Sequence, residues 1–206
     1  MRSFRLFTVL AAVISVVLLI AVSCTQQTEE KPMTKEEMIE HGKYLVTFGG
    51  CYDCHTPKVY TDKGPMLDTT RILSGFPQGE TLPEFDPAMV QPGKWVMCEG
   101  NFSGWVGPWG ISYAANLTPD NATGIGTLSE EMFIKTLREG KWMGVGRPLL
   151  PPMPWEPIGQ LNDKDLKSIY AYLMSLPPIH NEVPQPVTPN KLVDVSKMNQ
   201  KMKMAN

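Results

Sequence analysis

Apolar residues recur at helical spacing near residue 40 of the chain. Over residues 35–48 acidic residues come early, and the positions expected to share one helix face are Met38, His41, Leu45 and Phe48. Thr34 and Glu37 have the spacing of a capping box, in which each side chain binds the backbone N–H of the other residue. Because Gly49-Gly50 follows directly, the pattern predicts a helix over 35–48 that ends at these glycines.

Helical spacing returns in the second half of the chain. The stretch Thr127–Glu130 again has capping-box spacing, and the apolar stripe after it consists of Phe133, Ile134 and Leu137. Gly140 is a plausible end for this helix. A last helix is predicted to begin at Asn162 and to end before Pro177-Pro178, because proline cannot continue a helix.

The segment between these helices, residues 56–125, has no sustained helical or strand periodicity. It is rich in Pro, Gly, Asn and Asp, and it carries several aromatic residues between Trp95 and Tyr113. Aromatic side chains bury large areas, so an ordered covering layer is expected here rather than a disordered linker. Short strands are possible in this layer, but the pattern places none. With helices as the regular elements, the predicted fold class is all-α, loop-rich, with one long loop insertion.

The first residues of the chain predict export. A basic start precedes an apolar run over residues 6–22, and Ala21-Val22-Ser23-Cys24 resembles a bacterial lipobox. We predict a signal peptide over 1–23 and lipidation of Cys24, with simple cleavage or an uncleaved anchor as alternatives. Residues 24–34 would then link the lipid anchor to the folded domain. Each alternative places the remaining chain outside the cytoplasm, in the periplasm or on the outer cell surface.

Composition narrows the class of protein further. Hydrophobic residues make up 42% of the 206 residues, which excludes a wholly disordered chain. The formal net charge is −2, so no nucleic-acid surface is indicated. Residues 181–206 contain prolines and lysines with little periodicity, and we expect them to form an extended, loosely packed C-terminal tail. The folded domain is therefore predicted over 35–180.

Candidate chemistry is concentrated in Cys51-Tyr52-Asp53-Cys54-His55. A structural zinc site usually needs four ligands, but Cys24 is expected to be lipidated and Cys98 stands alone as a buried or free thiol. A redox dithiol would accompany alternating strands and helices, which the pattern lacks. Attachment of a c-type haem needs two thiols that become thioethers and a histidine directly after the second one. We therefore predict one covalent haem on Cys51 and Cys54, with His55 as the proximal iron ligand.

Several further stretches accompany this motif. They are Gly42–Thr47, Cys51–Lys58, Asn116–Asp120, Thr123–Gly126, Pro151–Trp155, Leu161–Leu166 and Tyr170–Leu173. With these stretches, residues 35–178 resemble the cytochrome c superfamily, and in particular the bacterial monohaem group similar to cytochrome subunits of periplasmic dehydrogenases. The resemblance implies a cytochrome c-like fold, in which helices enclose one covalently bound haem.

The resemblance also implies a distal iron ligand. Prolines flank Met153 on both sides, and in the family the methionine of this loop binds the iron opposite the histidine. Met143 lies in the same loop region and is the alternative. His41 or His180 would instead give bis-histidine ligation and a lower reduction potential.

An iron with both axial positions filled has no open site for a substrate, and the sequence contains no other signature of catalysis. The expected function is therefore electron transfer between redox protein donors and acceptors, with the chain held at a membrane by its lipid anchor and not acting as an enzyme. One alternative is a peroxidase-like or gas-binding haem enzyme with an open sixth site. Another is a cytochrome subunit of a larger dehydrogenase or oxidase, with residues 56–125 as its docking surface.

Overall fold

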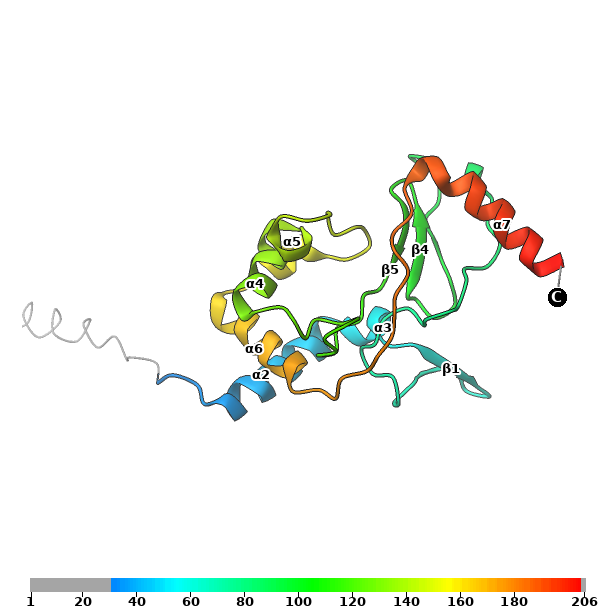
Figure 1. Ribbon diagram of the computed structural model, residues 1–206. Coiled ribbons are helices and arrows are strands. Elements are labelled where there is room, and N and C mark those ends of the chain that lie inside the picture. Colours follow the sequence, from blue (N-terminus) through cyan, green and yellow to red (C-terminus); the bar gives the residue numbers. More distant parts are fainter. Residues whose placement is uncertain (1–30, 205–206) are drawn as a thin grey trace, which may run out of the picture. The chain divides into compact units, whose positions relative to one another are not determined.

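The computed structural model describes residues 31–204, with side chains up to residue 201 (Figure 1). The chain divides into one unit of residues 1–33 and a second unit of residues 34–206. The predicted signal peptide and the predicted lipidation of Cys24 lie outside the described residues. No helix within residues 31–204 combines the length and the apolar character that crossing a membrane requires.

The first described helix, α2, spans Lys35–Phe48, as the sequence predicts. Its capping box is present: the Thr34 hydroxyl accepts from the Glu37 backbone N–H at 3.2 Å, and the Glu37 carboxylate accepts from the Thr34 N–H at 2.7 Å. Gly49 caps its C-terminal end. The short helix α3, Cys51–His55, begins directly afterwards.

The face of α2 that carries Met38, His41, Leu45 and Phe48 is not covered along its whole length, because Phe48 is 81% exposed. The buried residues of this helix are Gly42 and Val46. A Cβ atom on Gly42 would lie 1.8 Å from the carbonyl oxygen of Ser168 in helix α6, Asp163–Met174. The close approach of the two helix backbones therefore decides which face of α2 is covered, and periodicity alone did not reveal it.

Polar contacts hold α6 against the first two helices. The Nε2 atom of His41 in α2 lies 2.7 Å from the carboxylate of Asp165. The hydroxyl groups of Tyr52 in α3 and Tyr172 in α6 are 2.5 Å apart. These contacts fix α3, which carries both predicted attachment cysteines, relative to the packed pair of helices α2 and α6.

Helix α4 spans Glu130–Glu139, and its N-cap is Ser129, so the predicted cap at Thr127 is wrong by two residues. It ends at Gly140, which has the left-handed conformation favoured at helix C-termini. Helix α6 is capped by the side chain of Asn162, as predicted. The short helix α5, Trp155–Gly159, lies between them in the chain. Short 3-10 helices also occur at Pro87–Val90, Trp142–Gly144 and Pro189–Lys191.

The segment predicted to lack regular structure contains two antiparallel sheets. Strands β1, Lys58–Thr61, and β2, Gly64–Leu67, form a hairpin. Strands β3, Met97–Cys98, β4, Gly104–Gly107, and β5, Gly110–Tyr113, form a meander in that order. The all-α prediction is therefore wrong, because the domain combines helices with two small sheets.

The strands escaped prediction because each has only two to four residues. So short a run cannot show an alternating pattern above the background, and its stability comes from packing against distant segments. A second core cluster supplies that packing, separate from the helical one. Its buried members are Phe76, Leu82, Phe85, Val90, Val106, Ile111 and Leu192.

The C-terminal residues complete this second core. The chain after α6 rises to pass β5, where Ile111 and Val187 exchange backbone hydrogen bonds of 2.8 and 3.0 Å (Figure 1). Helix α7, Leu192–Met204, follows. Its Ser196 hydroxyl binds the carbonyl of Phe85, and Leu192 is 3% exposed. We call residues 179–191 the strap; buried contacts along the strap and α7 differ from the loose packing expected of the tail.

Candidate functional site

Helix α3 places the three predicted attachment residues on one face. Cys51, Cys54 and His55 stand at positions i, i+3 and i+4 of the same helical turn, so their side chains lie on one side. Asp53 is exposed on the other side. Gly50 precedes the helix in a left-handed conformation with φ 66°, which lets the chain turn sharply out of α2.

Both thiols are half-buried and neither is in a disulfide. Burial raises the pKa of the Cys51 thiol to about 11, and burial likewise raises the pKa of Cys54. A reactive redox dithiol or a zinc-binding pair functions as the thiolate and needs a lowered pKa. A thioether cannot ionise, so burial imposes no charge penalty on it. The environment of these sulfur atoms therefore suits covalent attachment better than thiolate chemistry.

His55 is buried, and its Nδ1 atom lies 2.7 Å from the backbone carbonyl oxygen of Ala115. A carbonyl oxygen can only accept, so Nδ1 carries the hydrogen atom. Desolvation lowers the pKa of His55 below its usual 6.5, which keeps the ring neutral at pH 7. Within the described residues no hydrogen-bond partner faces Nε2. The ring thus presents a free nitrogen lone pair, as an iron-ligating histidine must.

The carbonyl of Ala115 is held in place by the segment that contains Gly75. The backbone N–H of Gly75 donates to the carbonyl of His55 at 2.7 Å, and that of Phe76 donates to the carbonyl of Ala114 at 2.9 Å. Gly75 has φ 84°, and a Cβ atom there would lie 2.7 Å from the Ala115 oxygen. Residues 74–76 therefore pass between the attachment helix and the carbonyl that orients its histidine.

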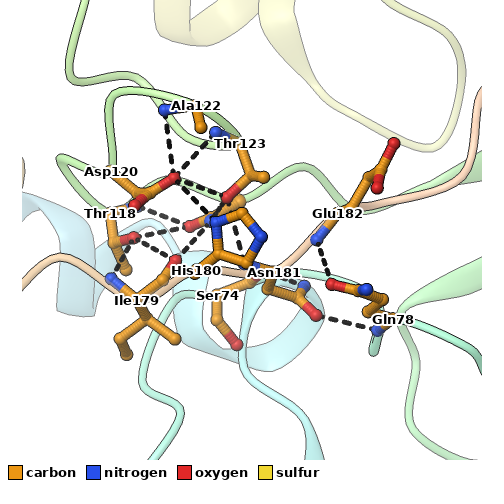
Figure 2. Close-up of polar contacts among 11 residues, drawn as sticks. Ser74, Gln78, Thr118, Asp120, Ala122, Thr123, Ile179, His180, Asn181 and Glu182 are labelled. Carbon is orange, nitrogen blue, oxygen red and sulfur yellow. Dashed lines mark hydrogen bonds and ion pairs between the residues drawn. The ribbon is translucent and has the colours of Figure 1, made fainter.

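The strap fixes the chain that follows Ala115, as Figure 2 shows. The Thr118 hydroxyl donates to the carbonyl of Ile179 and accepts from its N–H. The Thr123 hydroxyl accepts from the N–H of Asn181 at 3.0 Å and donates to Asp120 at 2.7 Å. Sequence reasoning missed this network, although Asn116–Asp120 was among the stretches of the family resemblance. The sequence does not show which side chains that are distant along the chain become hydrogen-bond partners.

Met153 follows α4 in the loop that leads into α5. Its side chain is half-buried and packs against the helical core, which Cys51 also contacts. Its backbone is fixed on both sides, because its N–H donates to Leu150 at 3.2 Å and its carbonyl accepts from Trp155 at 2.9 Å. Met143, the alternative ligand, is 39% exposed and has φ 55°. The structure thus brings Met153 and Cys51 to the same core.

The remaining candidates have partners elsewhere. His41 contacts Asp165 in the helix crossing described above. His180 is 65% exposed in its side chain and lies 3.6 Å from the carboxylate of Asp120. Cys98 in β3 is half-buried, and burial raises the pKa of its thiol to about 12. That Cys98 is a buried or free thiol and not an iron ligand stays a prediction.

Comparison with known proteins finds several relatives that are subunits of bacterial dehydrogenases, three of which are described here. The chain is 29% identical over 139 residues to the gluconate 2-dehydrogenase cytochrome c subunit of Pantoea cypripedii, which is 68% of this chain and 23% of that protein. It is 43% identical over 68 residues to the fructose dehydrogenase cytochrome subunit of Gluconobacter japonicus, covering 33% of this chain and 14% of that protein. The chain is similar to bacterial cytochrome subunits. This similarity confirms the resemblance to c-type cytochromes of dehydrogenases.

A third relative of this cytochrome-like chain is a nicotinate dehydrogenase subunit of Pseudomonas putida, 43% identical over 77 residues. The match covers 37% of this chain and 6% of that protein. The chain therefore spans less than a quarter of the length of each of these three relatives. No protein-family model matches it.

The residues of α3 fit the haem that a similarity to cytochromes indicates. Two sulfur atoms stand on one helix face in surroundings that suit a neutral thioether. The adjoining imidazole is neutral, oriented by a carbonyl, and open at Nε2. The ammonium of Lys58 closes the end of this helix by donating to the carbonyls of Asp53 and Thr56. The attachment helix α3 is therefore fixed at both ends by protein groups, independently of a cofactor.

Proposed function

We propose that the chain is an electron-transfer cytochrome with one haem attached to Cys51 and Cys54, and with His55 and Met153 as its axial ligands. The observation that carries this proposal is the hydrogen bond from His55 Nδ1 to the carbonyl of Ala115, which leaves Nε2 free on the same helix face as two neutral thiols. That combination suits covalent haem attachment and a proximal iron ligand.

When bound, the haem supplies one-electron chemistry through its ferric and ferrous states. The protein residues hold and tune it. Cys51 and Cys54 attach it, while the Ala115 carbonyl keeps the imidazole of His55 in one tautomer and one orientation. As an iron ligand, the thioether of Met153 would raise the reduction potential above that of a bis-histidine site, because its soft sulfur favours the reduced iron. With His55 and Met153 both holding the iron, the protein would act as an electron carrier and not as an enzyme.

The proposed location follows from the first residues. Residues 1–23 direct export, and Cys24 receives a lipid that holds residues 24–34 and the domain at a membrane surface, in the periplasm or on the outer face of the cell. Tethering of this kind raises the concentration of a carrier near its partners. A dehydrogenase is the proposed electron donor, since three relatives are named as dehydrogenase subunits.

Mass spectrometry of the exported, mature protein tests attachment and anchoring together. The expected mass corresponds to cleavage before Cys24, lipid on that residue and one covalent haem. Cys51→Ala and Cys54→Ala are expected to lose a thioether each, whereas Cys98→Ala retains the full haem. A colourless mature protein, or one that holds a different metal, would contradict the proposal.

Absorption spectroscopy tests the ligands. The ferric protein is expected to show the weak far-red charge-transfer band of a thioether bound to iron. Met153→Ala should abolish this band, while Met143→Ala, at an exposed methionine of the same loop region, should keep it. A wild-type protein that is high-spin and readily binds carbon monoxide would instead support an enzyme with an open sixth site.

The small fraction of each relative's length that this chain matches favours a second candidate function. Because the chain spans less than a quarter of each of them, it can correspond to one cytochrome module within a larger assembly. Residues 56–125 would then contribute the docking surface. Purification of the tagged, full-length chain in mild detergent distinguishes the two: a stable dehydrogenase in stoichiometric amount supports a subunit, and a single species supports a free carrier.

A further inference from the structure

Ser112 of β5 makes a contact that links the three-stranded sheet to residues 150–154, which contain Met153 and which we call the methionine loop. Its hydroxyl donates to the backbone carbonyl of Pro151 at 2.6 Å, across 39 positions of sequence. The same hydroxyl accepts a hydrogen bond from the indole N–H of Trp109 at 3.2 Å. Ser112 is 7% exposed, and both hydrogen bonds are partly buried. Their electrostatic strength is therefore greater than it would be at the surface.

The methionine loop needs a hydrogen-bond donor from another segment of the protein. Pro151, Pro152 and Pro154 have no backbone N–H, so between residues 151 and 154 only Met153 can donate, and it binds Leu150. A loop with so few internal hydrogen bonds is held by what packs against it. The hydroxyl of Ser112 provides such a contact two residues before Met153.

The Trp109 and Ser112 pair is itself firmly placed. The indole ring of Trp109 covers Gly107, where a Cβ atom would lie 2.6 Å from the ring. The strand continues into Ala114, whose N–H donates to the carbonyl of Ser103 at 2.7 Å. Ala115, one residue later, accepts from the Nδ1 atom of His55. Residues 112–115 thus contact both segments that carry the proposed axial ligands.

We propose that Ser112, oriented by Trp109, is a positioning residue for Met153: the hydroxyl holds the Pro151 carbonyl and thereby keeps the methionine sulfur directed at the iron. This inference rests on the proposed function, in which Met153 is the distal ligand. Loss of the hydroxyl leaves the Pro151 carbonyl without this donor and increases the fraction of protein in which the methionine is displaced.

The experiment uses the ferric holoprotein and titrates it with imidazole, which competes with the methionine for the iron. Ser112→Ala is expected to bind imidazole about tenfold more tightly than wild type, the factor that corresponds to losing about 1.4 kcal/mol of hydrogen bonding. Trp109→Phe, which removes only the indole donor, should show a smaller change in the same direction. The reduction potential of Ser112→Ala should fall, because methionine ligation stabilises the reduced iron.

Ser103→Ala is the matched control. Ser103 is also a buried serine, and its hydroxyl binds Glu99 at 2.9 Å without contacting the methionine loop. Its imidazole affinity and potential are expected to equal those of wild type, although its folding stability falls. Ser112→Thr retains a hydroxyl and should restore wild-type imidazole affinity, which a purely structural role of the serine would not require.

The outcomes separate the two proposals. If wild type has the thioether band and Ser112→Ala binds imidazole as Ser103→Ala does, the positioning role is overturned while the cytochrome assignment stands. If wild type carries haem but has no thioether band, ligation by Met153 fails and the positioning role fails with it. If Ser112→Ala does not fold, Trp109→Phe decides, and an unchanged imidazole affinity in that variant also overturns the inference.

Discussion

The Nδ1 atom of His55 lies 2.7 Å from the carbonyl oxygen of Ala115, although the two residues are 60 positions apart in sequence. This hydrogen bond determines which ring nitrogen carries the hydrogen atom and how the ring is oriented. It depends on the segment around Gly75, which packs directly on the Ala115 carbonyl. The contact makes the sheet-containing insert part of the proposed iron site.

Substitution of Gly75 by alanine should disrupt this arrangement. A Cβ atom would lie 2.5 Å from the Ala114 oxygen and 2.7 Å from the Ala115 oxygen, and the backbone is left-handed. We expect Gly75→Ala to lower the free energy of unfolding by about 3 kcal/mol, through about 1 kcal/mol of backbone strain and about 2 kcal/mol of overpacking. Urea denaturation of the holoprotein measures the loss.

Gly79→Ala is the control for Gly75→Ala. Gly79 has φ 79°, close to the 84° of Gly75, but nothing lies within 4 Å of a Cβ atom there. We expect this variant to lose only the strain contribution of about 1 kcal/mol. Equal losses for the two variants would show that the packing of Gly75 on the carbonyl is unimportant.

The strap should contribute to stability through Asn181. Its side-chain amide donates to the carbonyls of Ser74 and Phe76, and its oxygen accepts from the N–H of Gln78. Asn181→Ala leaves these buried groups without partners and should cost about 3 kcal/mol of unfolding free energy. Asn199→Ala, which removes a single bond to Leu82, should cost about 1 kcal/mol. Urea denaturation measures the unfolding free energy of both variants. Equal losses of unfolding free energy would show that Asn181 stabilises the protein no more than a single hydrogen bond does.

Asp68 should make stability dependent on acidic pH. Hydrogen bonds from the Thr70 hydroxyl and from Arg71 lower the pKa of its carboxyl group from 3.8 to about 2. A depressed carboxyl pKa contributes stability above the unfolded-state value of about 3.9, and this contribution is lost as pH falls through about 2. We therefore expect Asp68→Asn to destabilise the protein at pH 7 and to match wild type near pH 2.

Guanidinium unfolding at a series of pH values checks this dependence. Asp62→Asn is a suitable control, because Asp62 is exposed in the turn between β1 and β2. The free energy of unfolding of Asp62→Asn should stay close to that of wild type at every pH. If Asp68→Asn lowers the free energy of unfolding by the same amount at pH 7 and at pH 2, the charge of the Asp68 carboxylate is not the source of the stabilisation.

Folding of the domain should depend on haem attachment. Cys51 packs against the helical core, and His55 is buried beside it, so the porphyrin would supply apolar surface to that core. We expect Cys51→Ala and His55→Ala to melt about 10 °C or more below wild type and to be cleaved faster by protease. Cys98→Ala should melt close to wild type. Normal thermal stability in a haem-free variant would argue against this coupling.

Local rules predicted much of the helical part. The capping box at Thr34 and Glu37, the end of α2 at Gly49 and the cap at Asn162 depend on neighbouring residues, and the structure has all three. The exposure of Phe48 could not be predicted, because periodicity selects a face without showing that α6 approaches at Gly42. The sheets were missed for a similar reason, since strands of a few residues are stabilised by packing that no local pattern records.

What the sequence by itself determined is the spacing of Cys51, Cys54 and His55, which puts their side chains on one side wherever this segment is helical, as it is in α3. Only the tertiary structure decided which carbonyl meets the imidazole of His55 and which hydroxyl meets the carbonyl before Met153. Those partners, Ala115 and Ser112, are 60 and 39 positions away from the groups they bind. Such pairs are set by how sheet, strap and helices pack together, and residue type and local spacing carry no record of that packing.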